Sequence, residues 1–156
     1  MRFGLIVTSL LFSTISFAAD SALDNKTIKD RIAAIEATET KCLDTADSNN
    51  AMKQCAFSKH DEADALLNQV YKQIVTSLKA GAEQEKDLSD FEKLSQETLN
   101  RLVASERAWI TYRDTQCNYE GANMLNGSGE GLIIGGCLGS KTIGRIKEIM
   151  PISAEN

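Results

Sequence analysis

Residues 51–79 read AMKQCAFSKHDEADALLNQVYKQIVTSLK, and the spacing of their apolar side chains decides the fold. These side chains recur at intervals of three and four residues, which is the period of one face of an α-helix. The apolar face comprises Met52, Cys55, Ala56, Ala63, Leu66, Leu67, Val70, Ile74, Val75 and Leu78. The stretch therefore predicts a long amphipathic helix from about Ala51 to Lys79, ended by Gly81 because glycine commonly follows a helix.

The chain before this helix predicts its partner in a helical hairpin. Three isoleucines between residues 28 and 35 have helical spacing, and Asp24 or Asn25 is placed to cap the first turn. The polar residues 47–50 supply a stop for this helix and an N-cap for the next one. We therefore expect two antiparallel helices joined by a tight turn.

Two further helices are expected after the long one. Ser89 followed by Glu92 has the form of a capping box, which predicts a third helix from there to about Tyr119. The Gly-rich residues 121–131 predict a loop. An apolar face then predicts a fourth helix, which four glycines should make short or kinked and which Pro151 stops. No long alternating pattern indicates a strand, so the predicted class is all-α, an antiparallel bundle of about four helices.

Four cysteines are expected to form two disulfides in an exported chain. Cys42 and Cys55 are centred on the turn between the first two helices, so an antiparallel hairpin places them opposite each other. Cys117 and Cys137 are centred in the same way on the Gly-rich loop. Of the three pairings that four cysteines allow, we favour Cys42 with Cys55 and Cys117 with Cys137. Zinc is the less favoured alternative, because there is no CxxC motif and His60 is the only histidine.

Residues 1–18 have the features of a secretory signal peptide. Arg2 precedes an apolar stretch, and Ser16 and Ala18 are the small residues expected before a cleavage site. The apolar stretch is shorter than the roughly 20 residues that span a bilayer and contains several hydroxyl side chains, so no stable membrane anchor is predicted. Cleavage would leave residues 19–156 as a single periplasmic or secreted domain.

The charge of the chain limits its partners. Asp and Glu number 22 against 17 Lys and Arg, and the net charge is −5. Nucleic acid is not expected as a partner, because phosphate binding relies on clustered Lys and Arg, which the sequence lacks. An acidic protein is instead attracted to basic partners.

One group of polar residues is a candidate site. It comprises Asp64, Asn68 and Tyr71 on the second helix, Glu106, Trp109 and Arg113 on the third, and Thr142 and Arg145 on the fourth. Helical spacing places the members from each helix on one face. They form either a binding pocket or a network of ion pairs and hydrogen bonds that fixes how the helices pack, and we favour the packing network.

No catalytic, cofactor or metal site is predicted. His60 is expected on the solvated side of its helix, and no nucleophile elbow or HExxH motif accompanies it. The loop NGSGEG at 126–131 lacks the Lys and Thr of a phosphate-binding loop and is interpreted as a flexible turn. A hydrolase that uses paired carboxylates is ranked last, because nothing singles out a pair.

Several motifs together resemble a known family. They are NAMKQCA at 50–56, Ala63-Asp64, Leu67-Asn68, Tyr71, Trp109, Tyr112-Arg113-Asp114, Cys117, Cys137-Leu138, Thr142 and Arg145. From about Cys42 to Met150 the chain resembles the LprI-type lysozyme-inhibitor family. The resemblance implies a small exported α-helical domain with paired cysteines.

The resemblance also implies a function. The leading hypothesis is a non-enzymatic binding protein of the cell envelope that inhibits lysozyme. An acidic surface or the loop from Gly121 to Gly131, including Asn126, Ser128 and Glu130, would contact the enzyme. The alternative is a structural or stress-related envelope protein that binds another periplasmic protein and has no effect on lysozyme.

Overall fold

The computed structural model describes residues 23–89 and 93–150. Within these residues the chain forms four α-helices and one 3₁₀ turn: α1 (Asn25–Thr45), α2 (Asn49–Gln84), α3 (Leu94–Gly121), η1 (Ala122–Met124) and α4 (Glu130–Ile149). The predicted all-α class is therefore confirmed. The predicted signal peptide, the Glu92 half of the predicted capping box and Pro151 lie outside the described residues.

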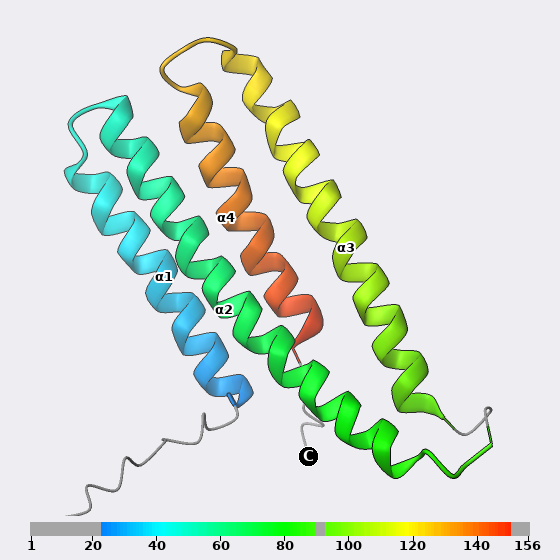
Figure 1. The fold of residues 1–156 in the computed structure, drawn as a ribbon. Helices are drawn as coiled ribbons and strands as arrows, with labels where there is room; N and C mark the ends of the chain where they lie inside the picture. Colours follow the sequence, from blue (N-terminus) through cyan, green and yellow to red (C-terminus); the bar gives the residue numbers. More distant parts are fainter. Residues whose placement is uncertain (1–22, 90–92, 151–156) are drawn as a thin grey trace, which may run out of the picture.

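The helices run antiparallel in chain order (Figure 1). The most extensive packing is between α2 and α4, whereas α1 contacts α2 and α3 contacts both α4 and α2. In Figure 1 the lower ends of α2 and α3 extend past α1 and α4. The connections α1–α2 and α3–α4 lie together at the opposite end, which we call the apex of the bundle.

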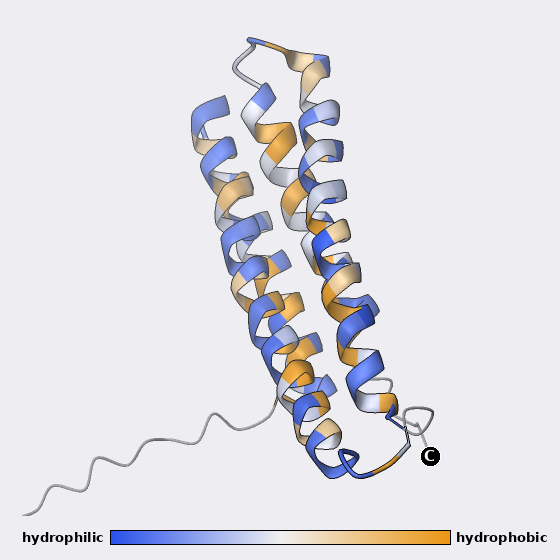
Figure 2. Ribbon diagram, turned by 45° about the vertical axis from the view of Figure 1, so that its right-hand side comes forward, coloured by the Kyte–Doolittle hydropathy of each residue, from blue (hydrophilic) through white to orange (hydrophobic). Residues whose placement is uncertain are grey.

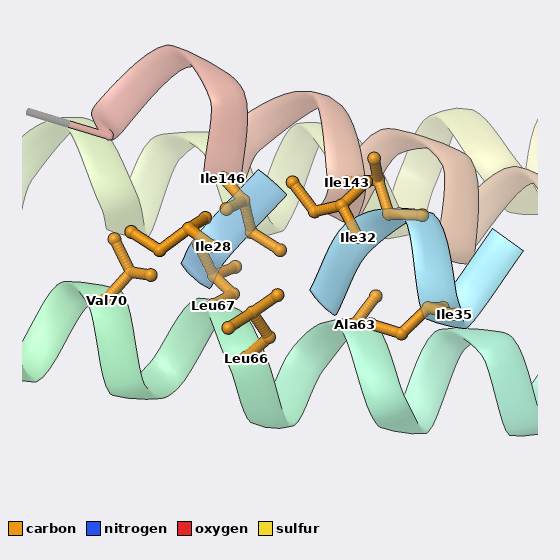
Figure 3. Close-up of a cluster of buried hydrophobic side chains, with 9 residues drawn as sticks. All are labelled: Ile28, Ile32, Ile35, Ala63, Leu66, Leu67, Val70, Ile143 and Ile146. Atoms are coloured by element: carbon orange, nitrogen blue, oxygen red, sulfur yellow. The ribbon is translucent and has the colours of Figure 1, made fainter. Parts of the chain in front are cut away.

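The apolar core lies among α1, α2 and α4 (Figures 2 and 3). Its buried members are Ile28, Ile32 and Ile35 from α1, Ala63, Leu66, Leu67 and Val70 from α2, and Ile143 and Ile146 from α4. Helix α3 contributes none of these, and its own buried residues include the charged Glu106 and Arg113. Helix α3 is attached to the bundle by these polar groups, by Trp109, which packs against the core, and by the buried Leu99 and Cys117.

The first two helices begin at side-chain caps. Asp24 Oδ1 accepts a hydrogen bond of 2.6 Å from the backbone N–H of Thr27, which satisfies an N–H group that the helix leaves unpaired. Ser48 Oγ accepts at 3.2 Å from the N–H of Ala51, so α2 begins at Asn49. Of the two caps predicted for α1, the structure selects Asp24.

The junction between α2 and α3 differs from the prediction. Gly81 lies inside α2 rather than ending it, because its φ is not positive as a glycine cap requires. Helix α3 begins at Leu94 rather than at Ser89. Glu85 binds its first turn by accepting from the N–H of Ser95 at 2.9 Å and from Ser95 Oγ at 2.6 Å. The cap of α3 thus comes from the end of α2.

Helix α4 is continuous over 20 residues, so the expectation of a short or kinked helix is wrong. A Cβ at Gly135 would lie 3.1 Å from Cβ of Ala56, and one at Gly139 would lie 3.0 Å from Cδ of Lys59. These two glycines therefore let α4 approach α2 closely. Packing along this interface offsets the low helix propensity of glycine.

Two disulfides form as predicted, and each joins the two helices of one hairpin. Cys42 is bonded to Cys55 and Cys117 to Cys137, with Cα–Cα distances of 5.7 Å and 5.5 Å. All four cysteines are consumed in these bonds. Among the described residues, no helix has the combination of length and apolar character needed to span a membrane.

Candidate functional site

Two arginine side chains lie over the ring of Trp109, one from α3 and one from α4. The Cζ atom of Arg113 is 5.1 Å from the centroid of the indole ring, and that of Arg145 is 5.7 Å from it. A guanidinium at this distance is attracted to the ring face. Trp109 and Arg113 are four residues apart on α3, so helical geometry places them one turn from each other. We call Trp109, the two arginines and their hydrogen-bond partners the Trp109 cluster.

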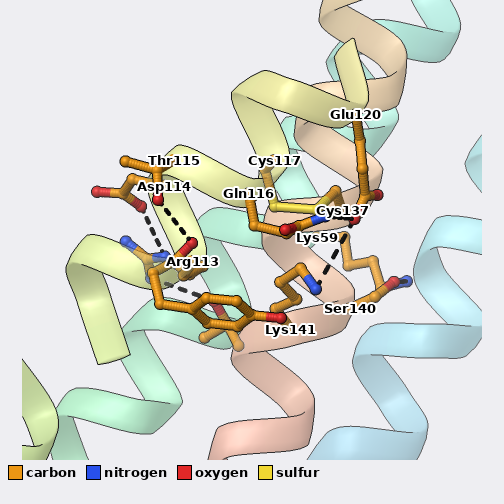
Figure 4. Close-up of a disulfide and its surroundings, with 12 residues drawn as sticks. Lys59, Arg113, Asp114, Thr115, Gln116, Cys117, Glu120, Cys137, Ser140 and Lys141 are labelled. Carbon is orange, nitrogen blue, oxygen red and sulfur yellow. Dashed lines mark hydrogen bonds and ion pairs between the residues drawn. A yellow bond between two sulfur atoms is a disulfide. The ribbon is translucent and has the colours of Figure 1, made fainter. Parts of the chain in front are cut away.

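Arg113 joins three helices. Its Nη1 donates to Asp64 Oδ1 of α2 at 3.1 Å and to Thr142 Oγ1 of α4 at 3.2 Å. Its Nε donates to Asp114 Oδ1 at 2.9 Å (Figure 4). Asn68 extends the cluster along α2, because its Nδ2 donates to Asp64 Oδ2 at 3.0 Å.

Arg145 makes the second junction of the cluster. Its Nε donates to Glu106 Oε2 at 3.0 Å, its Nη2 to Ser105 Oγ at 2.7 Å and its Nη1 to Glu148 Oε2 at 2.9 Å. Burial alone would lower the pKa of Arg145, but its bonds to Glu148 and Glu106 outweigh that effect and raise the pKa. The guanidinium is thereby fixed as a cation between α3 and α4.

Glu106 has one carboxylate oxygen without a partner. Oε2 accepts from Arg145, but Oε1 is buried and has no hydrogen-bond donor among the described residues. Leaving a buried acceptor unpaired costs about 1–3 kcal/mol. The side chain lines a hollow of about 360 Å³ between α2 and α3, together with Asp64, Leu67, Asn68, Tyr71, Val103, Arg107, Ile110 and Arg113.

Seven of the eight predicted polar residues are joined by these contacts. Tyr71 is the eighth: it is half-buried and lines the hollow, and it makes no hydrogen bond to another described residue. The chemistry of the cluster is that of ion pairing and hydrogen bonding.

His60 lies differently from its prediction. It is half-buried, and its Nδ1 is buried without a partner among the described residues. The N–H of His60 lies against Gly139 of α4, which has no side chain to hold it away. Burial lowers the pKa of His60, the positive charge of Arg113 lowers it further, and Asp64, Asp61 and Asp114 oppose the shift. The expected solvated histidine is therefore wrong, because the residue is half-buried and its Nδ1 is closed to solvent.

Lys59 makes polar contacts with α1 and α4 that the sequence analysis did not predict. Its Nζ lies 2.7 Å from Glu39 Oε2 of α1 and donates to Ser140 Oγ of α4 at 3.3 Å. Both charged side chains are mostly buried. No local pattern marks this pair, because Glu39 and Lys59 are on different helices and their contact depends on how α1 is rotated against α2.

The loop residues proposed to meet a partner are engaged within the chain. Asn126 has a φ of 60°, and its N–H donates to Glu130 Oε2 at 3.0 Å. Ser128 Oγ accepts from Asn49 Nδ2 at 2.8 Å, which ties the loop to the start of α2. Glu130 is the first residue of α4 rather than part of a flexible turn. The backbone of Asn126 and the side chains of Ser128 and Glu130 therefore brace the apex.

Exposed apolar side chains of the apex are a feature that the sequence analysis missed. Tyr119 is 74% exposed, Met124 51% and Leu125 65%. Tyr119 lies in the last turn of α3, Met124 ends η1 and Leu125 directly follows it. Figure 4 shows the Cys117–Cys137 disulfide, which precedes them on α3. The sequence does indicate this feature, since Met124 and Leu125 are apolar residues within a polar, Gly-rich segment that is expected to be exposed.

These observations define a class of protein: a small antiparallel four-helix domain held together by two hairpin disulfides and a buried arginine network. The family described as lysozyme inhibitor LprI matches residues 42–149, and this chain belongs to it. The matched region contains both disulfides and the whole Trp109 cluster.

The chain is also similar to two uncharacterized proteins. An uncharacterized protein of Rhizobium meliloti (strain 1021) is 38% identical over 105 residues, which cover 65% of this chain and 73% of that protein. The uncharacterized protein YecT of Escherichia coli (strain K12) is 27% identical over 113 residues, covering 72% of this chain and 65% of YecT. No solved structure matches the chain.

Proposed function

We propose that this chain is an exported protein that inhibits lysozyme by binding it, without catalysing a reaction. Its membership of the lysozyme inhibitor LprI family supports a protein as partner. The disulfides and the signal-like residues 1–18 support export to an oxidising compartment. Because all four cysteines are in disulfides, none supplies a catalytic thiolate.

The exposed apolar side chains of the apex support this proposal. Tyr119, Met124 and Leu125 are exposed apolar side chains on a segment anchored by a disulfide. Aromatic residues and Met are enriched in the buried cores of protein interfaces. A braced loop loses little conformational freedom on binding, so less of the interaction energy is spent on ordering it. The apex is thus suited to enter a concave surface such as the cleft of an enzyme.

The charge of the chain supports a basic partner. Its net charge of −5 attracts cationic proteins over a distance of several ångströms, and many lysozymes are basic. Salt screens this attraction, because the Debye length is about 10 Å at 0.1 M ionic strength and about 3 Å at 1 M. Inhibition is therefore expected to weaken as ionic strength rises.

A peptidoglycan hydrolysis assay with a panel of lysozymes tests the proposal. The oxidised protein should inhibit at least one of them in a dose-dependent way, and a reduced and alkylated sample should not. The double variant Met124→Ser, Leu125→Ser should raise the inhibition constant by about tenfold or more, as expected for an interface hot spot. Leu94→Ser is the matched control, because Leu94 is 69% exposed at the far end of α3.

Two results would contradict the proposal. Equal inhibition constants for the double variant and the parent would exclude the apex as the contact surface. Absence of inhibition across the whole panel would favour the alternative, an envelope protein that binds a different periplasmic partner.

A further inference from the structure

A groove runs along the interface of α2 and α3. It consists of two neighbouring hollows of about 360 Å³ and 490 Å³, which share Tyr71, Val103 and Arg107 as lining residues. We call the two hollows together the α2–α3 groove. The larger hollow extends towards the end of the bundle opposite the apex, where α2 and α3 continue past the other two helices (Figure 1).

The groove lies on a different side of α2 from the apolar core. Val70 belongs to the core among α1, α2 and α4, and Ile74 packs against it. Tyr71 and Val75 each follow one of these residues, and one residue turns an α-helix by about 100°. All residues that line the two hollows come from α2 and α3. The groove is therefore a surface of these two helices that is separate from both the core and the apex.

The polar side chains of the larger hollow are available as hydrogen-bond donors. Lys79 and Arg107 are exposed, and neither side chain has a hydrogen-bond or ion-pair partner among the described residues. The hydroxyl of Tyr71 also makes no hydrogen bond within the described chain. Asn100 Oδ1 accepts from Gln96 at 3.0 Å, which leaves the Nδ2 group of Asn100 to donate. These groups match a ligand that accepts hydrogen bonds.

Positive charge is concentrated here in a chain that is acidic overall. Residues 65–82 contain two lysines and no Asp or Glu, and residues 98–105 contain one arginine and no Asp or Glu. Arg107 also differs from the other arginines that the structure describes, because each of those bonds to the side chain of another residue. The others are Arg31, Arg101, Arg113 and Arg145. Arg107 is thus a cation available to a ligand.

The carboxylates that line the groove do not neutralise these cations. They are Asp64 and Glu106 in the smaller hollow, and both are paired with arginines of the Trp109 cluster. The larger hollow is lined by Lys79 and Arg107 and by no carboxylate. Hydrogen bonds between a cation and an anion are stronger than those between neutral groups. A negatively charged group is therefore the complementary occupant.

The two cations lie at opposite ends of an apolar strip. Lys79 is eight residues after Tyr71, which is about 12 Å along the helix. Tyr71 lines the same two hollows as Arg107, whereas Lys79 lines only the larger one. Val75 lies midway along α2, and Val103 adds apolar surface from α3. Two carboxylates about two helical turns apart, with apolar side chains between them, would match this arrangement.

We propose that the α2–α3 groove binds an acidic amphipathic helix of a partner protein, with one carboxylate at Arg107 and a second at Lys79. A groove between two helices receives the apolar face of a third. Helical residues seven positions apart share a face and are about 10.5 Å apart along the axis, which the long stems of Lys and Arg can meet. The proposal goes beyond lysozyme inhibition, because a cationic groove does not suit a basic enzyme.

The experiment is an NMR titration of the ¹⁵N-labelled, oxidised protein with capped helical peptides. The acidic peptide has two glutamates seven residues apart and two leucines between them on the same face. Matched peptides carry glutamine or lysine in place of both glutamates. A fourth peptide has the composition of the acidic one, but its second glutamate is moved by two residues to the opposite face.

Binding should depend on the charge and the spacing of the glutamates. We expect the acidic peptide to produce saturable shifts of backbone amides in residues 71–79 and 99–107. The glutamine peptide should bind about tenfold more weakly, because each exposed ion pair contributes a factor of about three. The peptide with the displaced glutamate should bind about threefold more weakly. The lysine peptide should produce no saturable shifts.

Variants of the protein locate the contacts. Lys79→Gln and Arg107→Gln should each weaken binding of the acidic peptide by about threefold. Lys29→Gln on α1 and Arg101→Gln on α3 are the matched controls, because they remove the same charge from exposed residues that do not line the groove. Both controls should leave the affinity unchanged. Thermal unfolding of each variant shows that it is folded.

A thermodynamic cycle assigns each carboxylate to its cation. Two further peptides each have glutamine in place of one glutamate. The glutamate that bonds to Arg107 should matter to the parent protein and not to Arg107→Gln, and the other glutamate should be coupled to Lys79 in the same way. General attraction between opposite charges gives no such pairwise coupling.

Several results would overturn the groove proposal. They are equal affinities for the acidic and glutamine peptides, preferential binding of the lysine peptide, and shifts confined to residues outside 71–79 and 99–107. Unchanged affinity in both Lys79→Gln and Arg107→Gln would do the same. None of these measurements involves lysozyme, so the groove proposal and the proposed function stand or fail separately.

Discussion

Asp64 and Arg113 are 49 residues apart in sequence and are joined in the fold by a hydrogen-bonded ion pair of 3.1 Å. The same Nη1 atom of Arg113 also donates to Thr142. One guanidinium therefore connects α2, α3 and α4. Because α3 meets the apolar core cluster only at its edge, through the partly buried Trp109, this connection helps to position α3.

Removing the guanidinium should destabilise the bundle. We expect Arg113→Met to lower the free energy of unfolding by about 2 kcal/mol, because it leaves the buried hydroxyl of Thr142 and the carboxylate of Asp64 without their donor. Part of the loss is screened by water, since the Asp64 side chain is 40% exposed. Urea denaturation followed by circular dichroism measures it.

Arg101→Met is the control for this prediction. Arg101 also lies on α3 and pairs with Glu97, but both side chains are exposed. An exposed pair of this kind contributes about 0.5 kcal/mol. Equal destabilisation by the two substitutions would show that the junction at Arg113 adds nothing beyond a surface ion pair.

Neighbouring glycines of α4 should respond in opposite ways to alanine. A Cβ at Gly135 would contact Cβ of Ala56 and Cδ2 of Phe57, each at 3.1 Å, whereas a Cβ at Gly136 would meet no atom within 4 Å. Gly136→Ala should stabilise the protein by up to about 1 kcal/mol through helix propensity. Gly135→Ala should destabilise it by about 1 kcal/mol, because overpacking outweighs that gain. Thermal unfolding of both variants is the measurement, and stabilisation by both would show that α4 does not rest closely on α2.

Each disulfide should contribute a similar stability. The bonds close loops with sequence separations of 13 and 20 residues. The chain-entropy account gives about 3 kcal/mol for loops of this size. Replacing both cysteines of one pair with alanine, one pair at a time, and measuring urea unfolding should show two losses of this order. A loss below about 1 kcal/mol for either pair would mean that the hairpin is already set by its helix packing.

The stability of the protein should fall at mildly acidic pH because of His60. Burial and the nearby charge of Arg113 hold its folded-state pKa below the ordinary value of 6.5. Between these two pKa values the unfolded chain binds more protons than the folded one. The contribution of His60 is therefore fully present above pH 6.5 and is lost as pH falls from 6.5 towards the folded-state pKa.

A comparison of pH profiles isolates this effect. The free energy of unfolding of the parent protein and of His60→Gln is measured from pH 8 to pH 5. The parent should lose more stability than the variant on passing below pH 6.5, since the variant lacks the titrating group. Parallel profiles would show that the imidazole is protonated as readily in the folded chain as in the unfolded one.

Local chemistry made much of the fold predictable. The helices, the all-α class and a break between α1 and α2 follow from apolar periodicity and polar residues, which are properties of neighbouring residues. The break itself is residues 46–48, slightly earlier than the predicted 47–50. The cysteine pairing followed as well, because the centre of each hairpin fixes which residues face each other. The failures occurred where a distant group replaced a local signal. Glu85, the residue that follows α2, binds the first turn of α3 at Ser95, and close contact with α2 makes Gly135 favourable inside α4.

The sequence by itself determined which residues of each helix share a face, because the 3.6-residue period orders side chains along a helix without reference to the rest of the chain. It therefore placed Glu106, Trp109 and Arg113 on one face of α3. Only the tertiary structure decided which of their atoms meet which partners. The rotation and closeness of neighbouring helices pair Arg113 with Asp64, bury Nδ1 of His60 and leave Glu106 Oε1 unpaired among the described residues. The rotation of each helix and its distance from its neighbours depend on side-chain volumes across the whole interface.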